Sequence, residues 1–136
     1  MAFFGVAILL YIMRLSGTFD LTIDDAPETK AQKIAQAIAR AEGFYTDSVL
    51  LQRLNNPVGL KLNGTTLTQF PTVQDGWNAA YHQVELMLSN RSNVYNKEMS
   101  IAQIAPIWTG GDKPEAWASI VSSELGVNKN TPISAV

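Results

Sequence analysis

The sequence predicts an α+β domain that is mainly helical, contains one small β-hairpin and follows an apolar N-terminal helix. The chain has 136 residues, of which 46% are hydrophobic, and this suits a single domain with one core. Several segments place apolar residues at helical spacing behind capping residues, which predicts the helices. An Asn-Gly pair between two leucine-containing runs predicts the hairpin.

The first 13 residues (MAFFGVAILLYIM) carry no charged side chain and are followed directly by Arg14. A helix of this length rises only about 20 Å, which is less than a bilayer core of about 30 Å, although snorkelling of Arg14 would supply some of the missing length. We expect residues 1–17 to be a membrane anchor, with a cleaved signal peptide or a helix packed on protein as alternatives. Residues 18–26 would link this segment to a domain over residues 27–136.

The first helix of this domain is predicted from about Pro27 to Glu42. Asp24 or Asp25 can cap it, and Pro27 suits its first turn because proline needs no hydrogen-bond acceptor there. Gly43 ends the helix, as a glycine just past the last turn commonly does.

A β-hairpin is predicted at Leu60–Phe70 (LKLNGTTLTQF). Asn63-Gly64 is a strong hairpin turn signal, and leucines stand at alternate positions beside it.

Further helices are predicted after the hairpin, each from a capping signal followed by apolar residues at helical spacing. They are a helix capped by Thr72 with Asp75 and carrying Trp77, Tyr81 and Val84; a helix opened by Ser100 with Gln103, interrupted by Pro106 and ended by Thr109-Gly110-Gly111; and a helix from about Lys113 to Leu125, capped by Asp112 and closed by Gly126.

Composition excludes several functions. Ten basic and twelve acidic side chains are mixed along the chain, so no basic stripe for nucleic acid forms. The absence of cysteine removes disulfides, thiolate catalysis and cysteine-ligated metals. His82 and Glu85 form a lone H-x-x-E pair with the chain's one histidine, which favours a solvated helix face over a metal site. We expect neither a metal nor a cofactor.

Glu42 is the candidate catalytic residue. It lies one turn beyond Ile38 and two turns beyond Ile34, so its side chain is expected near the buried edge of the first helix. The negative end of the helix dipole and partial burial both favour the protonated carboxyl. A protonated carboxyl beside a polar cleft can act as the general acid of glycoside cleavage. The alternative is a glutamate whose side chain simply bends into water, and the position of Glu42 at a helix end, taken alone, favours this alternative.

Four segments carry recognisable motifs in a fixed order: Ala37–Phe44 (AIARAEGF), Arg53–Leu60 (RLNNPVGL), Phe70–Ala80 (FPTVQDGWNAA) and Ser100–Ser134 (SIAQIAPIWTGGDKPEAWASIVSSELGVNKNTPIS). Over about Gln32 to Ser134 the chain thereby resembles a lysozyme-like family of phage and bacterial peptidoglycan-cleaving domains. Such domains have a helix ending in a catalytic Glu followed by Gly-Phe or Gly-Tyr, then an Asn-Asn-Pro turn, a hairpin, a Gly-Trp helix and a Tyr/Trp-Thr-Gly-Gly-Asp element.

This resemblance implies a lysozyme-like fold and places Glu42 at the catalytic position. The chain departs from the family pattern at Val58, which stands where glycine usually follows Asn-Asn-Pro. Because valine resists a positive φ, either the turn differs or the left-handed position has moved to Gly59.

Other residues are candidates for substrate contact. They share polar or aromatic side chains and places near the expected cleft: Tyr45, Asn55, Asn56, Thr66 and Trp108. Trp77 and Trp117 lie on helical stripes and are expected in the core. For a second acid, Asp47 is better explained as a loop charge and Asp75 as a helix cap.

These observations predict cleavage of the β-1,4 bond between N-acetylmuramic acid and N-acetylglucosamine in peptidoglycan. A single Glu can suffice for a lytic transglycosylase, which we favour over a hydrolase. The predicted setting is a phage particle with an internal membrane, whose anchored enzyme reaches the host periplasm and has virion proteins as neighbours. The alternatives are a membrane-anchored structural or peptidoglycan-binding protein without activity, and a small membrane protein that engages another protein.

Overall fold

The computed structural model describes residues 26–136, about half of which are helical. The helices are α1 (Lys30–Ala41), α2 (Val49–Arg53), α3 (Val73–Leu88), α4 (Ile101–Trp108), α5 (Pro114–Leu125) and a short 3₁₀ helix, η2 (Ile133–Ala135). The predicted anchor at residues 1–17 and all but the last residue of the linker lie outside the described residues. Within residues 26–136, no helix is long and apolar enough to cross a membrane.

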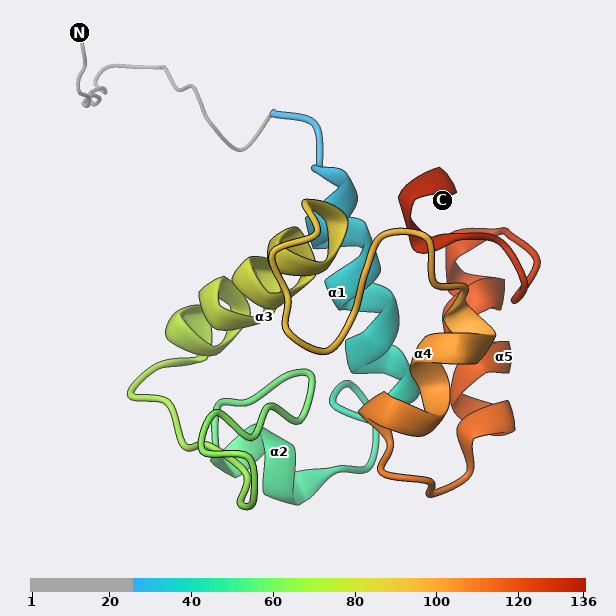
Figure 1. Ribbon diagram of the computed structural model, residues 1–136. Coiled ribbons are helices and arrows are strands. Elements are labelled where there is room, and N and C mark those ends of the chain that lie inside the picture. Colours follow the sequence, from blue (N-terminus) through green and yellow to red (C-terminus); the bar gives the residue numbers. More distant parts are fainter. Residues whose placement is uncertain (1–25) are drawn as a thin grey trace, which may run out of the picture.

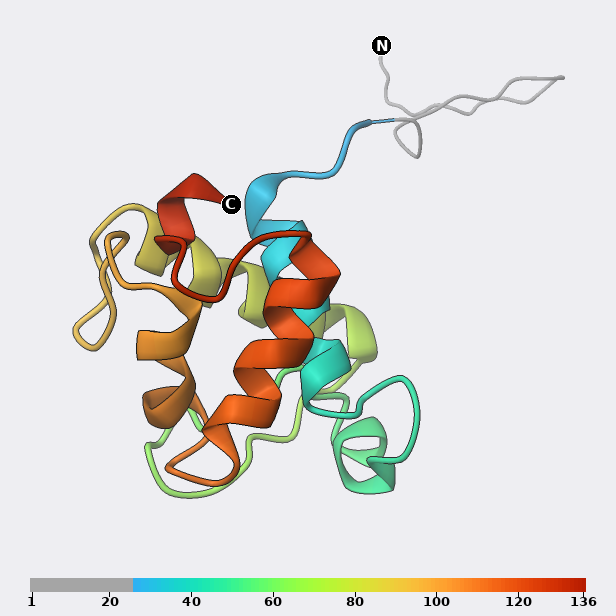
Figure 2. The ribbon, with the colours of Figure 1, turned by 90° about the vertical axis from the view of Figure 1, so that its right-hand side faces the viewer.

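Helix α1 is the centre of the domain. It packs against α3 on one side and α5 on the other, and α4 packs on α5 (Figures 1 and 2). The core between them is aliphatic, with buried side chains from each of these helices: Ile34, Ile38, Val84, Met87, Ile104 and Val121. The C-terminal segment returns to the start of α1, where the Lys30 ammonium donates a 2.6 Å hydrogen bond to the Ser134 carbonyl. The opposite end of α1, which carries Glu42, faces α2 and the loop that follows it (Figure 1).

Local capping signals explain where the long helices begin. The predicted caps Thr72 and Ser100 are confirmed, since the hydroxyl of each accepts the backbone N–H three residues ahead. Helix α1 begins later than predicted because Thr29 and Gln32 form a capping box. Pro27 therefore precedes the helix, while Asp24 and Asp25 lie outside the described residues.

The predicted cap of α5 is wrong. Lys113 is the N-cap residue, with φ 51° and no side-chain bond to the helix, and Pro114 occupies the first turn. Proline has no N–H to satisfy, which lowers the need for a side-chain cap. The Asp112 carboxyl is therefore not used to hold the helix. Helix α2, capped by Ser48, was not predicted; it is only five residues long.

The predicted hairpin at Leu60–Phe70 is wrong, and with it the α+β class, because no strand occurs among the described residues. The two arms do meet once, where the Thr68 N–H donates to the Leu60 carbonyl at 2.9 Å. Side chains take the neighbouring backbone groups: the Asn56 amide bonds both the N–H and the carbonyl of Leu60, and the Thr68 hydroxyl accepts the Leu62 N–H. These local bonds replace the pairing that a strand ladder needs.

Candidate active site

A cleft of about 450 Å³ opens where the end of α1, the loop after α2 and the connection between α4 and α5 meet. Its lining combines two carboxyl groups, two indoles and two lysine side chains. These groups belong to Glu42, Asp112, Trp108, Trp117, Lys61 and Lys113, and Gly59 lines the cleft beside them. The cleft is open to solvent, and both polar and apolar side chains line it.

Glu42 lies at the C-terminal end of α1, as its C-cap residue. Gly43 follows with φ 81°, which stops the helix and confirms the predicted helix end. The Trp117 indole N–H donates a 2.9 Å hydrogen bond to Oε2 of Glu42. A methyl group built on Gly59 would lie 3.4 Å from the other oxygen, Oε1, so the loop backbone passes close to the carboxyl. The carboxyl is thus enclosed on two sides while still lining the cleft.

Burial raises the pKa of the Glu42 carboxyl above its usual value of 4.5. The indole hydrogen bond from Trp117 and the nearby charge of Lys61 oppose this rise because both favour the carboxylate, whereas the negative charge of Asp112 adds to it. The net direction is upward, which retains the proton to a higher pH than on an exposed glutamate. The expectation of a carboxyl near the buried edge of the helix is therefore confirmed.

Trp108 lies in the same cleft as Glu42, as predicted for a substrate-contacting residue. Its indole N–H donates to the Val58 carbonyl at 3.2 Å, and its ring lies 6.1 Å from that of Trp117. The hydrogen bond fixes the ring between α4 and the loop. A fixed aromatic ring on a cleft wall is a surface on which a sugar can stack.

Asn55 and Asn56 hold the loop together and do not line the cleft. Asn56 is 0% exposed, and its amide bonds the carbonyls of Leu60 and Thr68 at 2.9 Å each. Asn55 adopts φ 55°, and its amide donates to the Phe70 carbonyl at 3.0 Å. Both amides are therefore committed to backbone groups, and neither contributes to the proposed glycan contacts below.

Thr66 also lies outside the cleft lining. It is exposed at the tip of the loop, where its backbone N–H and hydroxyl both bond the side chain of Asn63. The structure does not bring it to Glu42.

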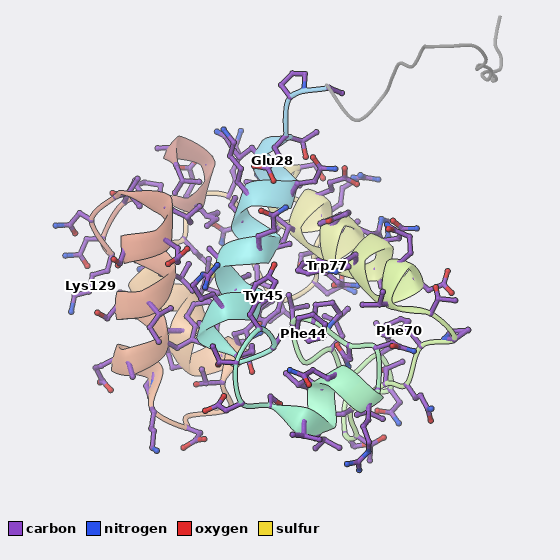
Figure 3. All side chains as sticks on the ribbon, turned by 180° about the vertical axis from the view of Figure 1, so that it is seen from behind. Glu28, Phe44, Tyr45, Phe70, Trp77 and Lys129 are labelled. Carbon is purple, nitrogen blue, oxygen red and sulfur yellow. The ribbon has the colours of Figure 1, made fainter. Side chains whose placement is uncertain are left out.

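Tyr45 lines a second, smaller hollow together with Arg40 and Glu124 rather than the Glu42 cleft. Tyr45 is 46% exposed, and its ring contacts Phe44 and Trp77 on the side of α1 that faces α3 (Figure 3). The Arg40 guanidinium lies 5.0 Å from the ring centre. Tyr45 therefore belongs to a separate aromatic cluster.

The Asn-Asn-Pro segment shows how the chain accommodates its extra valine. Val58 is buried, with 1% of its surface exposed, while Gly59 takes the left-handed conformation with φ 72°. The expectation that the left-handed position has moved to Gly59 is confirmed. This shift sets Gly59 against the Glu42 carboxyl.

Two residues that sequence reasoning did not assign to the site lie in it. Trp117 was expected in the core; it is 5% exposed and also bonds Glu42. Asp112 was expected to cap α5, whereas it lines the cleft. The considered second acids, Asp47 and Asp75, are absent from the cleft lining, and Asp75 bonds the capping residue Thr72. The one signal for Asp112 in the sequence was its place in the Trp-Thr-Gly-Gly-Asp element.

Within residues 26–136, no three His, Cys, Asp or Glu side chains gather as metal ligands would. Comparison of the chain with family models, curated proteins and solved structures gives no match.

Proposed function

We propose that the protein cleaves the β-1,4 bond between N-acetylmuramic acid and N-acetylglucosamine in peptidoglycan, with Glu42 as general acid and then general base. The observation that carries the proposal is the state of the Glu42 carboxyl: its pKa is raised by burial, one oxygen is held by Trp117, and it lines an open cleft. The resemblance of the surrounding motifs to lysozyme-like domains supports the substrate class.

The chemistry needs two proton transfers, one from Glu42 and one to it. Glu42 first gives its proton to the oxygen that leaves as the glycosidic bond breaks. The resulting carboxylate then takes a proton from the group that attacks the sugar. That group is water in a hydrolase and the sugar's own 6-hydroxyl in a lytic transglycosylase, so both reactions start from the same residue.

The walls of the cleft suit a sugar chain. Trp108 offers an aromatic ring beside the acid, and Leu50 and Ile120, exposed at 48% and 38%, line the same cleft. Apolar faces of this kind pack on the carbon-bound faces of sugars, while Lys61 and Lys113 supply hydrogen-bond donors at the rim. Asn55, Asn56, Thr66 and Tyr45 have no part in this proposal.

For the biological setting we keep the prediction of a phage particle with an internal membrane. An anchor at residues 1–17 in the internal membrane of a phage particle would deliver the enzyme to the host periplasm. Probing purified particles with an antibody against the domain tests it. The protein is expected in the particles, and its presence in infected-cell cytosol alone would contradict the setting without touching the chemistry.

The activity itself is tested by incubating the protein with purified peptidoglycan and analysing the soluble products by mass spectrometry. Disaccharide fragments with muramyl ends, either reducing or 1,6-anhydro, are expected. A folded protein that sediments with peptidoglycan and releases no sugar would instead support the peptidoglycan-binding alternative.

A further inference from the structure

We infer that Asp112 is the second carboxylate of the cleft and that it activates the water which attacks the sugar, making the reaction an inverting hydrolysis. This inference rests on the proposed function. It keeps Glu42 as the general acid and replaces it by Asp112 as the general base. It also revises the preference for a transglycosylase, which came from the lack of a second acid near Glu42 in the sequence.

Asp112 and Glu42 line the same cleft from different parts of the chain. Glu42 ends α1, whereas Asp112 lies in the connection between α4 and α5. A pair of carboxyls brought to one cleft by separate elements is the arrangement that glycoside hydrolysis uses.

The Asp112 side chain is free for such a role. It does not cap α5, whose N-cap residue is Lys113. Within residues 26–136, the ion pair formed is Arg40 with Glu124, and no side-chain hydrogen bond involves the Asp112 carboxyl. An exposed carboxylate with no structural partner can accept a proton from water.

The connection between α4 and α5 has an unfavourable backbone conformation next to Asp112. Lys113, the next residue, has φ 51°, a left-handed conformation that is unfavourable for a residue with a side chain. Thr109, on the other side, bonds the Ala105 carbonyl at 2.8 Å and accepts the Gly111 N–H at 3.2 Å. These contacts fix the turn that carries Asp112 into the cleft lining.

The separation of the two carboxyls decides the stereochemistry. Retaining enzymes hold them about 5 Å apart, whereas inverting enzymes leave about 6.5–9.5 Å, which admits a water molecule. Asp112 lies close enough for its negative charge to add to the rise in the pKa of Glu42. As the base that activates water, Asp112 would act on the face of the sugar opposite Glu42, which gives inversion, whereas retention would require Asp112 to bond the sugar directly.

The proposed step balances as a hydrolysis. Glu42 gives a proton to the leaving oxygen as the bond from C1 to that oxygen breaks. A water oxygen bonds C1 from the opposite face, and its proton passes to the Asp112 carboxylate. Asp112 then loses this proton to solvent, and Glu42 regains one, so the products are two sugars with one water added.

The test compares the full chain with Asp112→Asn and with the matched control Asp47→Asn, an exposed aspartate outside the cleft lining. Release of sugar from purified peptidoglycan gives the rate, and NMR of the fresh ends gives their anomeric form. We expect reducing muramyl ends that first appear as the α anomer. Asp112→Asn should lower the rate by about 10²–10⁴-fold with unchanged sedimentation on peptidoglycan and an unchanged melting temperature, while Asp47→Asn keeps the parental rate.

Each other outcome contradicts either the role of Asp112 or the proposed function. Anhydro ends from the parent, β-anomeric ends, or a parental rate from Asp112→Asn would remove the role of Asp112 and leave the proposed function intact. No release by the folded parent would contradict the proposed function itself.

Discussion

The indole N–H of Trp117 donates a 2.9 Å hydrogen bond to Oε2 of Glu42, joining the end of α1 to α5 across 75 residues of sequence. The bond fixes one carboxyl oxygen against the core, since Trp117 is itself buried. The other oxygen, Oε1, faces Gly59, whose lack of a side chain leaves room beside it. Glu42 therefore has one oxygen held by Trp117 and one that, in the proposed reaction, would exchange a proton with the sugar.

Replacing Trp117 by Phe keeps an aromatic ring and removes the donor. The pKa of Glu42 should rise further, because the lost hydrogen bond favours the carboxylate. Since the acid must be protonated to act, the alkaline limb of the kcat/KM profile should move to higher pH, with a fall in kcat of about 10–100-fold from poorer positioning. Trp108→Phe is the control, because its indole bonds a backbone carbonyl, and it should leave that limb in place. If the alkaline limb of the kcat/KM profile did not move in Trp117→Phe, the Trp117 hydrogen bond would have no influence on the pKa of the catalytic acid.

Glu42→Gln should stabilise the fold at neutral pH. Because the pKa of Glu42 is raised in the folded state, the folded protein binds the proton more tightly than the unfolded chain does. Stability is therefore lost as the pH rises from about 4.5 through the raised pKa, and a neutral side chain avoids that loss. Melting temperatures should be higher for Glu42→Gln than for the parent at pH 7–8 and equal below about pH 4. A variant less stable than the parent at pH 7 would show that the ionised Glu42 carboxylate stabilises the folded protein.

Gly59→Ala tests the close approach of the loop to the carboxyl. Its φ of 72° makes alanine unfavourable by about 1–2 kcal/mol, and the added methyl group would lie 3.4 Å from Oε1 of Glu42. Gly64→Ala is the matched control, since Gly64 has φ 83° and open space around it. Both variants should lose similar stability in urea denaturation, and Gly59→Ala alone should lower the rate of sugar release, by about tenfold. Equal rates of sugar release from the two variants would mean that the closeness of Gly59 to the Glu42 carboxyl has no part in the chemistry.

Asn56→Ala should destabilise the domain by about 2–5 kcal/mol. The substitution removes three hydrogen bonds and leaves the buried Leu60 N–H without a partner. Asn63→Ala, in the exposed turn of the same loop, should cost about 1 kcal/mol or less. Chemical denaturation of the two variants measures the difference. Similar small losses in both would contradict the role of Asn56 as the organiser of the loop.

Local signals in the sequence were sufficient to locate the long helices, although they misplaced the start of α1 and the cap of α5. Thr72 and Ser100 cap α3 and α4 through bonds to residues three positions ahead, which spacing alone can reveal. The hairpin was mispredicted because its outcome depends on side chains as well as on periodicity. Asn56 and Thr68 take backbone groups that a strand ladder would have used, and a pattern of alternating leucines does not report this competition.

The candidate site was predictable only in part. Glu42 could be located because helix periodicity and a following glycine set its position. Trp117 was correctly expected to be buried, yet the direction of its N–H and the identity of its partner depend on how α5 packs on α1. The Asp112 carboxyl entered the cleft because Lys113, rather than Asp112, became the N-cap residue of α5. Contacts between distant elements of this kind leave no local spacing to detect.

The role of Glu42 is tested most directly by the initial rate at which the full chain releases soluble glycan from dye-labelled peptidoglycan. The comparison is with Glu42→Gln and with Glu85→Gln, a control on the exposed face of α3. We predict that Glu42→Gln slows release by about 10²–10⁴-fold and that Glu85→Gln matches the parent. A Glu42→Gln protein that releases glycan at the parental rate would contradict the assignment of Glu42 as the acid.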